Sequence, residues 1–116
     1  MSTTSEPQRP VNRVELTGRV SAPPETRVLP SGDQVVSFRL IVPRSTAARR
    51  RSRQTVDTIE CSTWTSVLRR KVARLDPDTV VQVSGELRRR FSRGAGGVIS
   101  RVTVDLDTCA PLRSGA

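Results

Sequence analysis

The sequence of 116 residues contains no histidine and no tyrosine, and it has only one tryptophan and two phenylalanines. Without histidine, a Ser-His-Asp triad, a Cys-His dyad and a histidine-ligated zinc site are excluded. No apolar run approaches the roughly 18 residues that a membrane-spanning helix needs. The first six residues, Met-Ser-Thr-Thr-Ser-Glu, lack the apolar segment of a secretory signal. These absences favour a cytoplasmic protein that is not an enzyme and uses no metal or other cofactor.

Cysteine is also scarce, since Cys61 and Cys109 are the only two and lie 48 positions apart. Two thiols cannot complete a tetrahedral zinc site without histidine. A cytoplasmic location favours free thiols over a disulfide, which is the alternative. We therefore expect both cysteines to be small buried apolar residues.

Positive charge is abundant and unevenly distributed. Nineteen of the 20 basic residues are arginine, and 11 acidic residues leave a formal net charge of +9. Residues 44–104 contain 14 basic and five acidic residues, whereas residues 1–43 contain five and four. A basic block of this kind attracts a polyanion, with plain solubility as the alternative. A membrane surface is disfavoured because no helix has an apolar face of Trp, Phe and Leu.

Alternation of apolar and polar residues predicts five β-strands. They are expected at residues 14–20, 34–42, 55–64, 79–91 and 98–108. Alternation assigns Leu87 and Val102 to the buried face and Arg101, Thr103 and Asp105 to the exposed face. Residues 25–29 are expected to be extended, and residues 30–33 have the composition of a turn. The glycine-rich run 94–97 is predicted to be a hairpin loop, because it lacks the Lys-Ser/Thr pair of a phosphate-binding loop.

One α-helix is expected at residues 66–75, between the third and fourth strands. Leu68, Val72 and Leu75 recur there at helical spacing, and Asp76-Pro77 ends the helix. Thr65 or Ser66 provides the N-cap. This order of elements is typical of an all-β, five-stranded Greek-key OB-fold barrel. The domain is expected at residues 12–109, with a disordered segment at 1–11 and a short tail at 110–116.

Residues 44–54 connect the second and third strands and contain no large apolar side chain. Five of these eleven residues are arginine: Arg44, Arg49, Arg50, Arg51 and Arg53. The segment is longer than most hairpin loops and cannot enter a core. We expect a mobile basic loop whose arginines contact the polyanion.

Several segments resemble those of bacterial single-stranded DNA-binding proteins, in the same order along the chain. The matching segments are Asn12–Val20, Pro24–Arg27 with Ser31-Gly32, Val36–Leu40, Ile59–Trp64 and Val83–Arg90. The resemblance covers about residues 12–108, and the ordered set is more specific than any one motif. It implies an OB-fold that binds single-stranded DNA by stacking bases on aromatic rings in a basic groove. It also implies a homotetramer that protects exposed strands in replication, repair or recombination.

The resemblance places few aromatic residues at the family's stacking positions. Trp64 matches the aromatic residue before the helix, although it could instead pack on that helix. Phe91 lies one residue before the position matched by Ser92, and it shares the core parity of Leu87. Phe91 therefore reaches DNA only if its strand bulges or ends there. With few aromatics and many arginines, binding is expected to depend strongly on salt.

Alternation along the fourth strand separates its three consecutive arginines. Arg88 and Arg90 are predicted on the outer face with Trp64, whereas Arg89 has the core parity and is expected at an edge or interface. The predicted nucleic-acid contacts are Trp64, Phe91, Arg44, Arg49, Arg50, Arg51, Arg53, Arg88, Arg90 and Arg101.

A second hypothesis is an OB-fold interaction subunit that binds RNA or an acidic protein in a larger complex. The acidic tail with which many members of the family recruit partners has no counterpart in residues 111–116. Recruitment of partner proteins by that route is therefore not expected.

Overall fold

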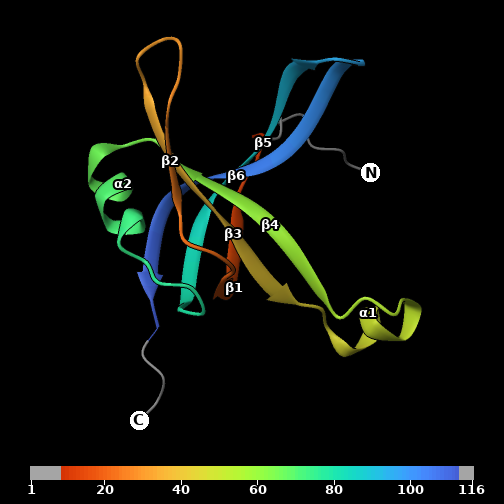
Figure 1. Cartoon of the computed structure of the whole chain (residues 1–116). Helices are drawn as coiled ribbons and strands as arrows, with labels where there is room; N and C mark the ends of the chain where they lie inside the picture. Colours follow the sequence, from red (N-terminus) through yellow and green to blue (C-terminus); the bar gives the residue numbers. More distant parts are fainter. Residues whose placement is uncertain (1–8, 113–116) are drawn as a thin grey trace.

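The strands lie close to where the alternation of apolar and polar residues predicts them. The computed structural model describes residues 9–112, and its strands are β1 (Val14–Val20), β2 (Glu25–Val28), β3 (Gln34–Pro43), β4 (Val56–Thr63), β5 (Val80–Gly94) and β6 (Gly97–Pro111). The segment predicted to be extended is β2, which pairs with β3 alone. The other five strands correspond to the five expected ones (Figure 1).

These five strands close into a barrel in the order β1-β5-β6-β4-β3. β1 completes the closure, because Arg19 and Val20 also pair with Ile41 and Leu40 of β3. Arg19 is at the same time paired with Val80 of β5. The pairing of β4 with β6 is parallel and aligns Cys61 with Val104. The predicted OB-fold is confirmed.

Helix α2 (Ser66–Ala73) follows β4 and is the predicted helix between the third and fourth barrel strands. The Thr65 hydroxyl accepts a hydrogen bond from the backbone N–H of Leu68, as an N-cap residue does. Leu68 and Val72 are buried. The helix ends at Ala73, two residues earlier than predicted. No helix within residues 9–112 is long and apolar enough to cross a membrane.

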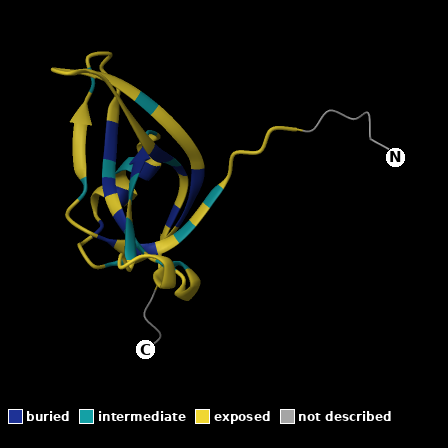
Figure 2. Cartoon of the chain, turned by 90° about the vertical axis from the view of Figure 1, so that its right-hand side faces the viewer, coloured by how far each residue is buried: buried dark blue, intermediate teal, exposed yellow. Residues whose placement is uncertain are grey.

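The core combines the inward residues of the barrel strands with α2 (Figure 2). Its buried members include Phe38, Leu40, Val81, Val83 and Val104. Cys61 and Cys109 are buried free thiols, as predicted. A Cβ on Gly18 or on Gly85 would lie 2.3 Å from the Ile41 carbonyl oxygen or 2.0 Å from that of Asp105. Glycine is thus required at both positions, because a side chain would collide with the backbone of the neighbouring strand.

A β-bulge between Ser84 and Gly85 changes the parity of β6. Ser84 pairs with Thr108 and Gly85 with Leu106, so Asp107 has no partner across the ladder. This extra residue allows both Leu106 and Cys109 to be buried. β6 then continues to Pro111, and Leu112 N–H donates to the Val80 carbonyl at 2.8 Å. Residues 110 and 111 of the predicted tail therefore belong to the sheet, and Leu112 is bonded to its edge. Residues 113–116 lie outside the described residues.

The β5–β6 hairpin is longer than the sequence predicts, with 15 residues in each strand. Its outer part, residues 87–102, projects beyond the other strands in Figure 1, and we call it the hairpin arm. Leu87 and Val102, which alternation assigns to the core, are 48% and 46% exposed. The prediction of burial was wrong because no other strand covers this end of the hairpin.

The basic segment 44–54 contains a short helix, α1 (Thr46–Arg51), where the sequence predicts a loop. Ser45 caps it by accepting a hydrogen bond from Ala48 N–H at 3.3 Å. Ala47 and Ala48 favour helix, but no residue of α1 is buried, so the helix leaves no apolar periodicity in the sequence. The helix projects away from the barrel (Figure 1).

The N-terminal segment predicted to be disordered covers residues 1–11, of which 1–8 lie outside the described residues. Residues 9–13 precede β1 without regular secondary structure. Asn12 is nevertheless held by hydrogen bonds to β5 at Leu87.

Candidate nucleic-acid interface

A groove of about 390 Å³ crosses the outer face of β2, β3 and β4 and reaches the base of the hairpin arm. It is lined by more basic than acidic side chains. The charged residues of the lining are Arg27, Arg39, Arg90, Arg101, Glu25 and Glu60. Trp64 is its only aromatic residue apart from the buried Phe38. The groove is therefore a basic and partly apolar hollow in which a base and its phosphate can be held together.

Strand register explains why these side chains meet. Residues that face each other across a ladder lie on the same face of the sheet. Ser37 is paired with Ser62, and Ser62 is aligned with Asp105 of β6. The two small serines leave space in the floor, and longer side chains form the walls.

Trp64 lies at the end of β4, inside the groove. The guanidinium carbon of Arg90 lies 4.9 Å from the centroid of the indole ring. This is the geometry of a cation–π contact. The indole Nε1 is buried and has no hydrogen-bond partner among residues 9–112. The structure thus places Trp64 on the predicted outer face, with part of its ring covered by an arginine.

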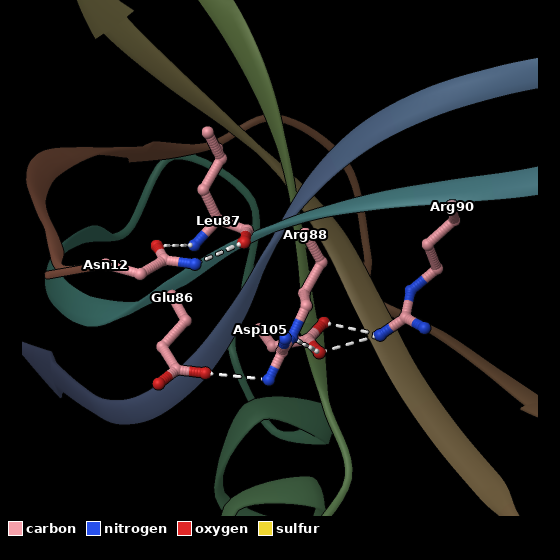
Figure 3. Close-up of polar contacts among 6 residues, drawn as sticks. All are labelled: Asn12, Glu86, Leu87, Arg88, Arg90 and Asp105. Atoms are coloured by element: carbon pink, nitrogen blue, oxygen red, sulfur yellow. Dashed lines mark hydrogen bonds and ion pairs between the residues drawn. The ribbon is translucent and has the colours of Figure 1, made fainter. Parts of the chain in front are cut away.

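Arg90 and Arg88 share the carboxylate of Asp105 (Figure 3). Arg90 Nη2 donates to both carboxylate oxygens, at 2.8 and 2.7 Å. Arg88 Nη2 donates to Glu86 at 2.8 Å, and its Nε lies 3.6 Å from Asp105 Oδ2. Both predicted outer-face arginines are therefore paired with acidic side chains.

Arg101, the third predicted arginine of this face, lies 3.3 Å from a carboxylate oxygen of Glu60. Thr103, which alternation predicts to be exposed, is buried. It lies opposite Arg88 in the ladder, on the face that the long arginine side chains occupy. Each of the three arginines on this face therefore has a carboxylate partner.

Arg89 and Phe91 lie on the other face of the hairpin arm. Arg89 is opposite Val102 in the ladder, and its Nη1 donates to the Ser100 hydroxyl at 3.0 Å. Phe91 has the same parity and is 67% exposed. It is exposed because the arm extends beyond the barrel, so a core-parity residue here has nothing to pack on. The groove does not include Phe91.

The arginines of segment 44–54 divide into two groups. Arg44 forms an ion pair with Asp57 at 2.8 Å, and this hydrogen-bonded partner lowers the pKa of Asp57. Its backbone N–H also donates to the Thr55 carbonyl, so Arg44 anchors the base of the segment. The other four are exposed and have no carboxylate within ion-pair distance among the described residues: Arg49, Arg50, Arg51 and Arg53.

These four residues, Arg49, Arg50 and Arg51 of α1 and Arg53 just after it, are called the α1 arginines below. They lie at the opposite end of the β3–β4 ladder from Trp64. The ladder has eight residue pairs, from Pro43 with Val56 to Val36 with Thr63. At about 3.3 Å per residue this length is ~25 Å. The structure therefore brings together Trp64, Arg90 and Arg101, with Arg88 beside them, and places the α1 arginines apart.

Two groove residues, Arg27 and Arg39, are absent from the predicted site. Alternation with Phe38 and Leu40 already assigns Arg39 to the outer face, so its position could have been predicted. No such signal exists for Arg27, because every residue of β2 is exposed. Its place in the groove depends on the pairing of β2 with β3.

Comparison with known proteins gives consistent results. Residues 11–111 match the single-strand binding protein family. The single-stranded DNA-binding proteins of Bacillus cereus and Bacillus anthracis are each 32% identical over 87 residues, or 75% of this chain. The match covers 51% and 50% of those relatives, so the chain spans about half their length.

A solved structure described as the Plasmodium falciparum SSB complex with single-stranded DNA has the same fold. It superimposes with a TM-score of 0.76 at 18% sequence identity. The superposition covers 93% of this chain and all of that one. At this level of identity, the likeness concerns the barrel architecture.

Proposed function

Because the chain belongs to the single-strand binding protein family, we propose that it binds single-stranded DNA in the groove beside Trp64, without strong sequence preference. The observation that carries the proposal is the position of the only tryptophan within a groove lined by four arginines. Every base has a π-face, so stacking on an indole ring tolerates any sequence and contributes roughly 1–3 kcal/mol per base.

The arginines of the groove supply the contacts with the DNA backbone. Arg27 and Arg39 lie on neighbouring strands along its wall, and neither forms an ion pair among the described residues. Guanidinium groups bind phosphate oxygens through two parallel hydrogen bonds and also stack on bases. A single strand that crosses the groove therefore meets guanidinium groups that can donate hydrogen bonds to its phosphates.

A single strand suits this groove better than a duplex. The bases of a duplex are stacked and paired, so a ring inside a groove cannot reach their faces. A flexible strand can turn one base toward Trp64 and continue along the β3–β4 ladder toward the α1 arginines. We include these four arginines as backbone contacts, and Phe91 as a second stacking position on the hairpin arm.

The cellular role that we propose is protection of exposed strands in replication, repair or recombination, in the cytoplasm at the nucleoid. This role involves no chemistry on the DNA and needs no cofactor. A homotetramer is part of the proposal, supported by the resemblance to bacterial single-stranded DNA-binding proteins. Light scattering of the purified chain, with and without oligonucleotide, measures its mass in solution.

Fluorescence of the single tryptophan tests the proposed function. Oligo(dT), duplex DNA of equal length and poly(U) are titrated into the protein at fixed salt. We expect oligo(dT) to bind most tightly and to quench the emission, because a base stacks on the indole. Equal affinity for duplex without quenching contradicts the proposal. Preference for poly(U) supports an RNA-binding subunit instead.

A further inference from the structure

We propose that Asp105 is an internal counter-ion of the groove, and that a DNA phosphate replaces its carboxylate when a strand binds. The inference rests on the proposed function and concerns how tightly that same site binds. It makes an acidic residue, rather than another arginine, the side chain that determines affinity and salt dependence at the arm end of the groove.

The geometry shows a carboxylate placed where a phosphate is needed. Asp105 lies on β6 opposite Glu86 of β5, and its carboxylate contacts the guanidinium groups of Arg88 and Arg90. Its side chain is only 20% exposed. One nitrogen of Arg90 donates to both of its oxygens. A carboxylate and a phosphate offer the guanidinium group similar pairs of acceptor oxygens. The two anions therefore compete for the same donors.

In the free protein, the negative charge of Asp105 weakens the attraction of Arg88 and Arg90 for a DNA phosphate. Arg88 is held by both Glu86 and Asp105, and Arg90 is held by Asp105. A phosphate that approaches either arginine lies well within a Debye length, about 8 Å at physiological salt, of the Asp105 carboxylate. Removing this negative charge strengthens the attraction of both arginines for the strand.

Asp105 also holds Arg90 over the Trp64 ring. The same guanidinium group bonds to the carboxylate and lies 4.9 Å from the ring centroid. A base that stacks on that side of the indole needs the ring face that Arg90 covers. Transfer of Arg90 from Asp105 to a phosphate frees this face, so backbone binding and base stacking are coupled through one side chain.

Asp107 provides a matched control two residues further along β6. Its carboxylate accepts a hydrogen bond from the Ser84 hydroxyl at 2.7 Å. No arginine within residues 9–112 lies within ion-pair distance of it. Asp105→Asn and Asp107→Asn therefore change the net charge equally, but only the first releases arginines. Glu86→Gln is a third variant, which weakens the hold on Arg88 alone.

The experiment measures oligo(dT) affinity for the wild type and the three variants over a series of salt concentrations. We expect Asp105→Asn to bind roughly two- to fivefold more tightly, the range that measured exposed ion pairs correspond to. Its slope of log K against log salt should steepen by up to about 0.7 for each arginine released to a phosphate. Glu86→Gln should show a smaller change in the same direction, and Asp107→Asn should match the wild type.

Two results overturn the inference. One is unchanged or weaker binding by Asp105→Asn when thermal melting shows that this variant is folded. The other is an equal gain for Asp107→Asn, which shows that net charge alone matters. Titration with inorganic tripolyphosphate separates this inference from the proposed function. If the wild type fails to bind oligo(dT), the proposed function is wrong. Tighter tripolyphosphate binding by Asp105→Asn than by Asp107→Asn still supports the replacement of the Asp105 carboxylate by a phosphate group.

Discussion

The side-chain amide of Asn12 pairs with the backbone of Leu87 as though it were one more residue of a strand. Its Nδ2 donates to the Leu87 carbonyl at 2.8 Å, and its Oδ1 accepts from the Leu87 N–H at 2.7 Å (Figure 3). The pair joins the segment before β1 to β5 at the point where the hairpin arm leaves the barrel.

We therefore expect Asn12→Ala to lower the free energy of unfolding by about 1–2 kcal/mol, because it removes two hydrogen bonds worth about 1 kcal/mol each. Chemical denaturation measures the loss. Arg13→Ala is the control, since it breaks only an exposed ion pair with Glu15 and should change stability little. Equal losses for the two variants contradict the role assigned to Asn12.

Replacement of Trp64 should reduce DNA binding through lost stacking. Trp64→Ala should weaken oligo(dT) binding by roughly 1–3 kcal/mol. Trp64→Phe keeps an aromatic ring and should lose less. Both affinities are measured by anisotropy of labelled oligo(dT), because the intrinsic fluorescence is removed. A folded Trp64→Ala variant with wild-type affinity means that the ring only packs in the groove.

Neutralising the α1 arginines should change salt dependence without changing stability. In a variant with glutamine at Arg49, Arg50, Arg51 and Arg53, the salt slope should become shallower by up to about 0.7 per lost contact. The melting temperature should stay the same, because α1 buries no residue. Arg44→Gln should lower the melting temperature and leave the salt slope unchanged, since it breaks the pair with Asp57. An unchanged slope in the first variant removes the segment from the interface.

Phe91→Ala tests whether the hairpin arm takes part in binding. Phe91 lies on the face of the arm away from Arg90, so only an oligonucleotide long enough to pass around the arm should sense its loss. We expect weaker binding of long oligo(dT) and unchanged binding of short oligo(dT). Unfolding should be unaffected because the ring is exposed. Phe91→Trp should restore the long-strand affinity and add a local fluorescence signal.

The buried Cys61 should resist modification in the folded protein. Burial, with smaller effects of Cys109 and Glu60, raises the pKa of Cys61 from its ordinary value of 9.0 to about 12. The thiol therefore stays protonated and should react with iodoacetamide at pH 8 only as fast as the protein unfolds. Because the pKa is higher in the folded state, its stabilising contribution is complete below pH 9 and is lost as the pH rises toward 12. Rapid reaction of native Cys61 contradicts this placement.

The alternation of apolar and polar residues within each strand was sufficient to predict the barrel. Alternation in residues such as Phe38, Leu40, Val81 and Val83 depends only on which side of a strand is buried, and each strand carries that signal by itself. The N-cap at Thr65 and the helical spacing of Leu68 and Val72 are equally local. The same parity places Arg88 and Arg90 on the outer face, and it would have placed Arg39 there too.

Tertiary structure decided what those residues meet and whether they are covered. Leu87 and Phe91 have the parity of core residues, yet the length of the β5–β6 hairpin leaves them in solvent. Asp105 lies 15 positions from Arg90 in sequence, and only the register of β5 with β6 brings its carboxylate to that arginine. Parity is a property of one strand, whereas burial and charge pairing are properties of neighbouring strands. The sequence alone therefore determined the fold and the outward face, and strand pairing determined which charges on that face are already neutralised.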